Sequence, residues 1–227
     1  EGNYNTAVGE SALSNDTLGS NSVAIGRNAL QTQNFTTATN AYNVAMGYSS
    51  GGAVTTGIYN TLLGAVAGDA LTDADGNVAV GTWALSSDTL GSRSTAIGYY
   101  ALEAQNFTTA TNSYNTAVGY EAGKTISTGV NNTIIGGLAG DALTDADNNV
   151  AVGQGALTTD TKGSKNTAVG HSALEAQNFT TSTTSHNTAI GADSGKAITT
   201  GVQNTILGSS AGDALTDADS NAALGAY

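Results

Sequence analysis

The 227-residue chain contains no cysteine, no proline and no long apolar run, and only 6 of its residues are lysine or arginine. Without cysteine it forms neither disulfides nor thiolate metal sites. The shortage of cations argues against nucleic acid, because phosphate neutralisation needs Lys and Arg, and a formal net charge of −12 argues against anionic membrane surfaces. No run approaches the roughly 18 apolar residues of a membrane helix. We therefore expect no nucleic-acid partner and no membrane insertion.

Large side chains are also scarce, with 3 Phe and 1 Trp beside 30 Gly. The apolar residues are mostly Ala, Val, Leu and Ile in short runs, which cannot fill a wide core. This composition predicts a thin interior. Because the chain begins at Glu1 rather than Met, we expect it to be a segment of a longer protein.

A five-residue motif recurs thirteen times: Asn or Ser, usually Thr or Val, two apolar residues, and Gly. Its glycines are Gly9, Gly26, Gly47, Gly64, Gly81, Gly98, Gly119, Gly136, Gly153, Gly170, Gly191, Gly208 and Gly225. Successive glycines are 17, 21, 17 and 17 residues apart, three times over, so four coils form a super-repeat of 72 residues. A fixed period of this kind is typical of solenoids.

Each coil is too short for a helix pair or a propeller blade, and carries about five β-compatible residues followed by a glycine turn. The repeat predicts an all-β fold, a parallel β-solenoid or flattened β-roll of thirteen coils of 17 or 21 residues. Stacking at about 4.8 Å would pair each strand with the coils above and below. We expect one solenoid segment over residues 1–227, with super-repeats at 9–80, 81–152 and 153–224.

Side-chain columns follow from the two-residue period of a strand. The apolar residue before each glycine, such as Val8 or Ile25, shares a face with the Thr or Val two places earlier, and we assign this Val/Ile column to the core. The opposite face carries Asn or Ser and a small residue. Both faces are then largely apolar or self-pairing, which is typical of a strand buried on both sides. A thin roll has one inside, so the second face predicts another copy of the chain as partner.

The recurring asparagines predict a structural ladder in which stacked side-chain amides hydrogen-bond from coil to coil. The predicted ladder residues are Asn5, Asn43, Asn60, Asn77, Asn115, Asn132, Asn149, Asn166, Asn187, Asn204 and Asn221.

The motif Asn21-Ser-Val-Ala-Ile-Gly26 and its copies resemble the repeats of YadA-like heads of trimeric autotransporter adhesins. The phrases Ala101-Leu-Glu-Ala-Gln-Asn-Phe-Thr-Thr-Ala110 and Gly140-Asp-Ala-Leu-Thr-Asp-Ala-Asp147 are similar to repeats in tail-fibre proteins of marine bacteriophages, cyanophages in particular. The resemblance covers the whole chain and implies a left-handed roll, a homotrimer, and a place on a virion tail fibre or a bacterial cell surface. The coils here are longer than the usual adhesin-head coil, so turn contacts do not carry over.

Acidic residues gather in the turn of every fourth coil. Oxygen donors at alternating positions resemble the start of a calcium loop, although no Glu stands at the twelfth position. The alternative is that these carboxylates cap backbone N–H groups in a tight turn. The candidate calcium ligands are Asp69, Asp73, Asp75, Asp141, Asp145, Asp147, Asp213, Asp217 and Asp219.

The two residues after each motif glycine vary while their surroundings repeat. Varied, partly aromatic turns on a constant scaffold indicate a binding surface for a host glycan or protein receptor; the alternative is drift at unconstrained positions. The candidate ligand-facing residues are Tyr48, Trp83, Tyr99, Tyr100, Tyr120 and His171. Each 21-residue coil also sets one Phe, namely Phe35, Phe107 or Phe179, in a Thr-rich bulge, where it packs against the roll or a neighbouring chain or contacts a ligand.

The sequence offers few candidate catalytic residues, because its only histidines are His171 and His186. The Asp-rich turns recur three times, whereas an active site would be expected once. The sequence favours a structural and host-recognition segment of a trimeric fibre and no enzyme. A rival of another class is an ice-binding solenoid. Its threonine column, which includes Thr6 and Thr61, is interrupted by Val and shares its face with the presumed core column, which argues against that role.

Overall fold

A computed structural model describes residues 2–226 of the chain. Over these residues every regular element is a β-strand, and none is a helix of the length and hydrophobicity needed to cross a membrane. The chain divides into two compact units, Glu1–Tyr114 and Asn115–Tyr227. The boundary lies inside the predicted super-repeat 81–152, and each unit is described by itself.

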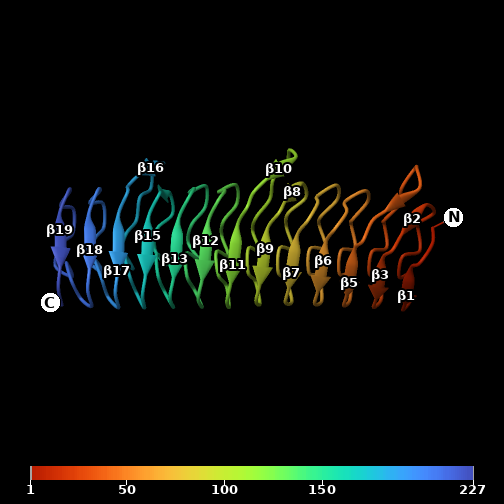
Figure 1. The fold of residues 1–227 in the computed structure, drawn as a ribbon, viewed down its shortest axis with the longest axis horizontal. Coiled ribbons are helices and arrows are strands. Elements are labelled where there is room, and N and C mark those ends of the chain that lie inside the picture. Colours follow the sequence, from red (N-terminus) through yellow and green to blue (C-terminus); the bar gives the residue numbers. More distant parts are fainter. Residues whose placement is uncertain (1, 227) are drawn as a thin grey trace. The chain divides into compact units, whose positions relative to one another are not determined.

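The first unit is a stack of coils, each of which contributes one three-residue strand to a parallel sheet (Figure 1). The sheet strands, in order, are β1 (Thr6–Val8), β3 (Val23–Ile25), β5 (Val44–Met46), β6 (Thr61–Leu63), β7 (Val78–Val80) and β9 (Thr95–Ile97). Two short parallel pairs accompany them: β2 (Gly19–Ser20) with β4 (Thr39–Asn40), and β8 (Gly91–Ser92) with β10 (Thr111–Asn112).

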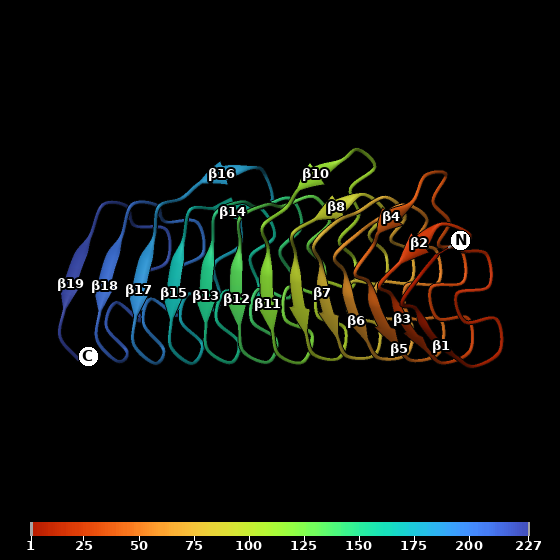
Figure 2. The same cartoon turned by 45° about the vertical axis from the view of Figure 1, so that its right-hand side comes forward.

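The second unit repeats this arrangement with seven sheet strands. They are β11 (Thr116–Val118), β12 (Thr133–Ile135), β13 (Val150–Val152), β15 (Thr167–Val169), β17 (Thr188–Ile190), β18 (Thr205–Leu207) and β19 (Ala222–Leu224). One short pair, β14 (Gly163–Ser164) with β16 (Thr183–Thr184), completes the unit. Figure 2 shows each coil with its strand on one side and its return path on the other. All thirteen strands lie in the repeated motif, so the predicted all-β parallel solenoid of 17- and 21-residue coils is confirmed.

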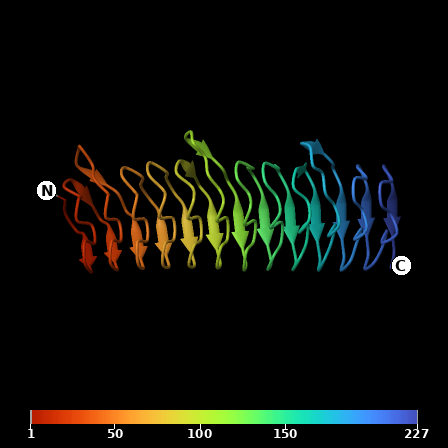
Figure 3. The ribbon, with the colours of Figure 1, turned by 180° about the vertical axis from the view of Figure 1, so that it is seen from behind.

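The strand register places equivalent motif residues opposite one another, as in Thr133 opposite Val150 and Val150 opposite Thr167. The longer coils keep this register because their four extra residues leave the stack. Figure 3 shows them projecting beyond neighbouring coils, in the green segment that leads to β10 and the blue segment that leads to β16. Phe107 and Phe179 in these bulges are buried, so they pack back onto their own chain and do not stand out as ligand contacts.

The core is built from the middle residue of each sheet strand and the Ala/Leu pairs after the turn. Ala24 and Ala45 are fully buried, and the column widens to Leu62 in the first unit and to Ile134 and Ile206 in the second. The Val/Ile column faces outward instead: Met46 remains 47% exposed and Ile135 39% exposed. The assignment of this column to the core was therefore wrong, although the predicted alternation of faces was right.

The reason lies in the asparagines, which share the inward face with the alanines. Asn43 and Asn60 are fully buried, and the Nδ2 group of Asn43 donates to the backbone carbonyl of Gly57 at 2.7 Å while its Oδ1 accepts from the backbone N–H of Asn60 at 2.9 Å. A buried amide is stabilised where its groups find hydrogen-bond partners, and the backbone of the adjoining coil supplies them on the inward face. Polarity of a side chain is thus a poor guide to its face here.

The asparagine ladder joins successive coils mainly through the backbone. In the second unit Asn132 accepts from the N–H of Asn149 at 2.9 Å and donates to the carbonyl of Ala146 at 2.8 Å. Direct amide-to-amide bonds occur as longer additions, such as Asn132 Nδ2 to Asn115 Oδ1 at 3.3 Å. Asn43 and Asn132 therefore each hold the chain at two points of the adjoining coil, whereas the buried Nδ2 group of Asn166 has no hydrogen-bond acceptor among the described residues.

The motif glycines allow the coils to approach this closely. Gly47 has φ of +140°, and a Cβ atom there would lie 2.3 Å from the carbonyl oxygen of Gly64. Any other residue would combine a strained backbone with a clash.

Candidate functional site

The first and third residues of each sheet strand point away from the core and form two side-chain columns. We call the surface made by these two columns the outer face. One column is Thr or Val and the other is Val, Ile, Leu or Met, so every coil presents a β-branched residue and an apolar residue side by side. In the second unit, five of the six large-sheet strands from β11 to β18 begin with Thr, the exception being β13. The residues of both columns are half-buried or exposed in each unit, and no described residue covers them. This is an unusually regular apolar surface to leave in water.

A column of exposed residues borders the outer face just before the ladder asparagines, and the sequence analysis missed it. In the first unit it includes Tyr4, Tyr42, Tyr59 and Tyr114, all with positive φ. The rings of Tyr42 and Tyr59 stack with centroids 5.7 Å apart and an interplanar angle of 8°. Arg93 lies over the ring of Tyr114 at 5.6 Å. The signal was present in the sequence, since Tyr directly precedes the motif Asn in four coils.

The turn after the motif glycine holds the predicted ligand-facing residues, and the structure brings three of them together. Trp83 stacks on Tyr100 with ring centroids 6.2 Å apart, and Tyr99 meets Tyr100 edge to face at 4.2 Å. Trp83 is 40% exposed and Tyr99 43%, while Tyr100 is half-buried between them. These three residues are the aromatic cluster of the first unit.

The other predicted ligand-facing residues lie apart from this cluster. Tyr48 is exposed and takes the guanidinium of Arg27 over its ring at 5.8 Å, and Arg27 also pairs with Glu10 at 3.1 Å. Tyr120 and His171 are exposed on turns of the second unit. No single pocket collects the candidates, and none is found anywhere in residues 2–226.

The Asp-rich turns direct their carboxylates to different partners. The last Asp of each turn accepts a hydrogen bond from a backbone N–H of the preceding coil: Asp75 from Ile58 and Asp147 from Val130, both at 2.8 Å. Asp219 accepts from Val202 in the same way, also at 2.8 Å. These carboxylates thus cap backbone groups, but the N–H belongs to the adjoining coil rather than to their own turn.

The middle Asp of each turn bonds a side chain. Asp73 accepts from the hydroxyl of Thr56, Asp145 forms an ion pair with Lys162 at 3.7 Å, and Asp217 accepts from Thr216 at 3.2 Å. Over residues 2–226 no three acidic or histidine side chains come close enough to hold a metal ion. Calcium needs six to eight converging oxygens, and the calcium site at these turns stays a prediction.

The first Asp of each turn is the most sheltered in the first two copies. Burial raises the pKa of Asp69 to about 6, and its Oδ1 atom is buried without a hydrogen-bond donor among the described residues. Burial also raises the pKa of Asp141, although the hydroxyl of Thr158 donates to its Oδ1 at 2.5 Å and partly opposes the rise. Asp213 is exposed.

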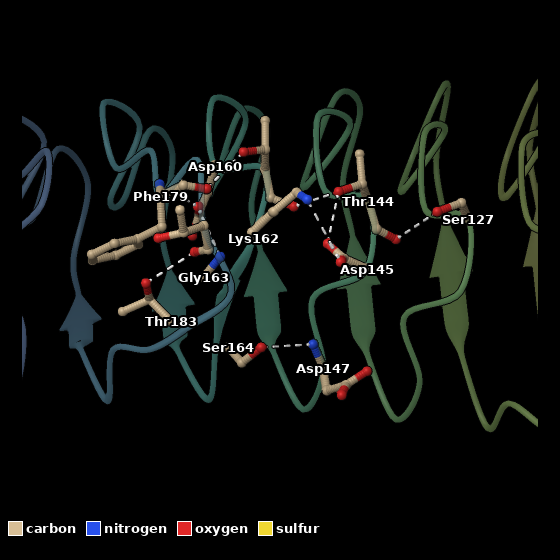
Figure 4. A network of polar contacts seen from close by, with 12 residues as sticks. Ser127, Thr144, Asp145, Asp147, Asp160, Lys162, Gly163, Ser164, Phe179 and Thr183 are labelled. Atoms are coloured by element: carbon tan, nitrogen blue, oxygen red, sulfur yellow. Dashed lines mark hydrogen bonds and ion pairs between the residues drawn. The ribbon is translucent and has the colours of Figure 1, made fainter.

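A second set of aspartates, Asp16, Asp88 and Asp160, anchors the bulges and was not singled out from the sequence. Asp160 is fully buried and its Oδ1 accepts from the N–H groups of Gly163 and Phe179, both at 3.0 Å. Its Oδ2 accepts from the side-chain amide of Gln177 at 2.6 Å. Figure 4 shows Asp160 beside Gly163 and Phe179, and Lys162 directed toward Asp145 in the neighbouring coil. The recurrence of Asp three residues before Gly at a 72-residue spacing was the available signal.

No protein-family model, curated protein or solved structure matches the chain. The functional argument therefore depends on the surfaces described above.

Proposed function

We propose that the chain is a structural and host-recognition segment of a homotrimeric fibre, a phage tail fibre on the virion, with a bacterial trimeric adhesin head as the alternative. The observation that carries this proposal is the outer face. In each unit an apolar column and a β-branched column run from coil to coil without a cover.

Copies of the chain are suitable partners for the outer face because they repeat with the same period. If the rotation axis is parallel to the stacking direction, each coil of one copy lies level with the same coil of the next. The Val/Ile columns of the copies then meet along the axis, and burial of each side chain contributes about 1 to 2 kcal/mol. Three copies, rather than another number, is what the adhesin and tail-fibre resemblance implies.

Recognition is assigned to the turns, which vary while the sheet repeats. A fibre presents each turn in several copies, so weak sites act together through a high effective concentration. A host-surface glycan or a protein receptor is the expected partner, and nucleic acid is not, given a net charge of −12. We propose no catalytic role.

The solution mass, measured by light scattering, tests the proposal. We expect three chains for the wild type and one chain for the double variant Ile135→Lys/Ile190→Lys, because lysines on the outer face would place like charges at the axis. The matched control is Thr200→Lys, which adds a charge at an exposed turn outside the sheet. A wild-type mass of one chain would refute the trimer.

An ice-binding solenoid is the second candidate, and one observation now favours it more than the sequence did. The threonine column lies on the outer face rather than against a core, with five threonines in β11 to β18 of the second unit. The same face cannot both be buried in a trimer and contact ice. Thermal hysteresis in a protein with a mass of one chain would support this candidate, and its absence from a trimer would support the fibre.

A further inference from the structure

We propose that the aromatic cluster formed by Trp83, Tyr99 and Tyr100 is a binding site for a neutral carbohydrate. This inference depends on the proposed recognition role of the turns and names the ligand class for one of them. The cluster joins two neighbouring coils, since Trp83 follows the motif glycine of one coil and the two tyrosines follow that of the next.

The fold imposes a left-handed backbone on every described residue that stands second after a motif glycine, and two neighbouring coils place an aromatic residue there. Trp83 and Tyr100 have φ of +63° and +58°, in the left-handed region that bulky side chains rarely adopt. The same position is held by Asn28 and Gly155, which tolerate it better, but also by Val66 and Leu138. Strained residues that persist without a structural return point to function.

Burial offsets the cost of this conformation only in part, because a large share of the Trp83 and Tyr99 side chains stays accessible to water. Trp83 is 40% exposed and Tyr99 is 43% exposed. By contrast, Leu85 adopts φ of +54° but is fully buried, so packing compensates for its conformation. The rings of the cluster contact each other and leave accessible surface for a third ring to stack on.

The cluster does not recur along the chain, whereas the columns of the outer face recur in every coil. One super-repeat later, the equivalents of Trp83, Tyr99 and Tyr100 are Gly155, His171 and Ser172. An interface between copies follows the coil period, as the Val/Ile column does, whereas a single aromatic patch suits a ligand of limited size. Aromatic rings offer sugars a rigid apolar surface at low entropic cost, with polar groups at their margins.

The absence of charge at the cluster specifies a neutral sugar. Three successive coils carry Ala65-Val66, Thr82-Trp83 and Tyr99-Tyr100 after their glycines, with no carboxylate, lysine, arginine or histidine in these pairs. Other turns at the same position carry Glu10, Arg27, Glu121 and Asp193. An anionic glycan would find no cation in these turns and would meet the field of a chain with net charge −12.

Trp83 is the only tryptophan, so its fluorescence reports directly on the site. We expect a saturable change in that fluorescence when cello-oligosaccharides or manno-oligosaccharides are titrated into the whole chain, and none with polyuronate oligosaccharides. Tyr100→Asn should weaken binding about tenfold, which is about 1.4 kcal/mol. Trp83→Gly should abolish the retardation of the chain in a gel that contains the neutral polysaccharide. Both replacements occur naturally at equivalent positions, so the variants should fold.

The matched control is Tyr42→Asn/Tyr59→Asn, which removes two stacked tyrosines from the other border of the sheet and should leave binding unchanged. Equal loss of binding in this control, or no response to any neutral sugar, would overturn the inference. A fall in the light-scattering mass of Trp83→Gly would also overturn it, since the cluster would then be a contact between copies. A trimer that binds no sugar would leave the fibre proposal intact, and a single chain that binds one would leave only the carbohydrate site.

Discussion

Leucine occupies left-handed backbone positions in both units and tyrosine does so in the first, for different reasons. Leu30 and Leu85 have φ of +47° and +54° and are fully buried. Burying a leucine contributes about 1.5 to 3 kcal/mol, which exceeds the roughly 1 to 2 kcal/mol that the conformation costs. Tyr42 and Tyr59 have the same conformation and remain about half exposed. Their retention indicates a role at the surface rather than in the core.

Asp69 gives a pH-dependent prediction at this scale. Burial raises its pKa from 3.8 to about 6, so the folded state binds a proton that the unfolded state releases between these values. Stability should therefore fall as the pH rises from about 4 to about 6, and the ionised carboxylate should cost roughly 1 kcal/mol above that range after allowance for solvent screening. We expect Asp69→Asn to raise the urea midpoint at pH 7 and to change it little at pH 4.5.

The control for this variant is Asp73→Asn in the same turn, whose carboxylate is exposed. If both variants shifted the midpoint equally at pH 7, burial of Asp69 would not be the cause.

The sequence predicted the asparagine column but not the atoms that it bonds. Stacked amides were expected to pair with one another, whereas Asn43 and Asn132 bond mainly to backbone groups of the next coil. The position of a neighbouring carbonyl depends on the path of the whole coil, which no local pattern encodes. The sequence also did not distinguish the two kinds of aspartate. Asp160 is fully buried and accepts backbone hydrogen bonds, whereas Asp145 is exposed and pairs with Lys162, although both lie in polar turns.

At the scale of elements, three-residue strands are too short to define a fold by themselves. Their pairing is supported by contacts on either side, and one of these is the set of three hydrogen bonds that Asp160 accepts. Asp160→Ala would leave the N–H groups of Gly163 and Phe179 and the amide of Gln177 without an acceptor. We expect a loss of about 3 kcal/mol or more in the free energy of unfolding, measured by urea denaturation.

Asp145→Ala is the comparison for Asp160→Ala, because its carboxylate is exposed and pairs with Lys162 at 3.7 Å. An ion pair of this kind contributes at most about 1 kcal/mol. Similar losses in the two variants would show that the buried hydrogen bonds of Asp160 matter no more than a surface contact.

The Asp-rich turns make a separate prediction about metal removal. Their carboxylates bond to backbone and side-chain donors and do not converge. We expect the same melting temperature in excess chelator and in millimolar calcium. A higher melting temperature with calcium would instead support the calcium-site prediction, because a ligand that binds only the folded state must stabilise it.

The sequence pattern predicted which residues share a face of a strand, but not which face points into the core. Alternation predicted which residues share a side, and the register confirms it, as in Ala24 opposite Ala45. The choice of inside was wrong because it ranked Val8 and Ile25 above Asn43 by hydrophobicity. The inward face offers backbone hydrogen-bond partners to asparagine, so Asn43 is buried there and the Val/Ile column faces outward.

At the scale of the whole molecule, the spacing of thirteen glycines was enough to predict the architecture. Each motif glycine directly follows one sheet strand, so the glycine spacing gives the position of every strand in the stack. The recognition surface was harder to predict. Trp83 and Tyr100 come from different coils, and their contact depends on the stacking of those coils. Repetition thus reveals the scaffold, while the features that break the repetition need the structure.

Repeat architecture predicts that one coil can be removed from within a unit. Deletion of residues 137–153 would bring β12 beside β15 with Thr133 opposite Thr167, which preserves the register. Because stability in such proteins is nearly a sum over neighbouring repeats, we expect a folded variant with an unchanged circular dichroism spectrum per residue and a lower unfolding free energy. As a comparison, deletion of residues 137–145 removes about half a coil, breaks the register and should prevent cooperative unfolding. Equal behaviour of the two variants would contradict the additive picture.

The glycine column has a consequence for how such a gene changes over time. A side chain on Gly47 would clash with Gly64, one on Gly64 would clash with Gly81, and the same contact recurs from Gly153 to Gly170. A point mutation at any of these sites damages two coils, whereas recombination between two copies of the motif adds or removes whole coils and leaves every such contact intact. We expect related genes to differ in the number of their repeats more readily than in the glycines, so that length is the trait most open to selection.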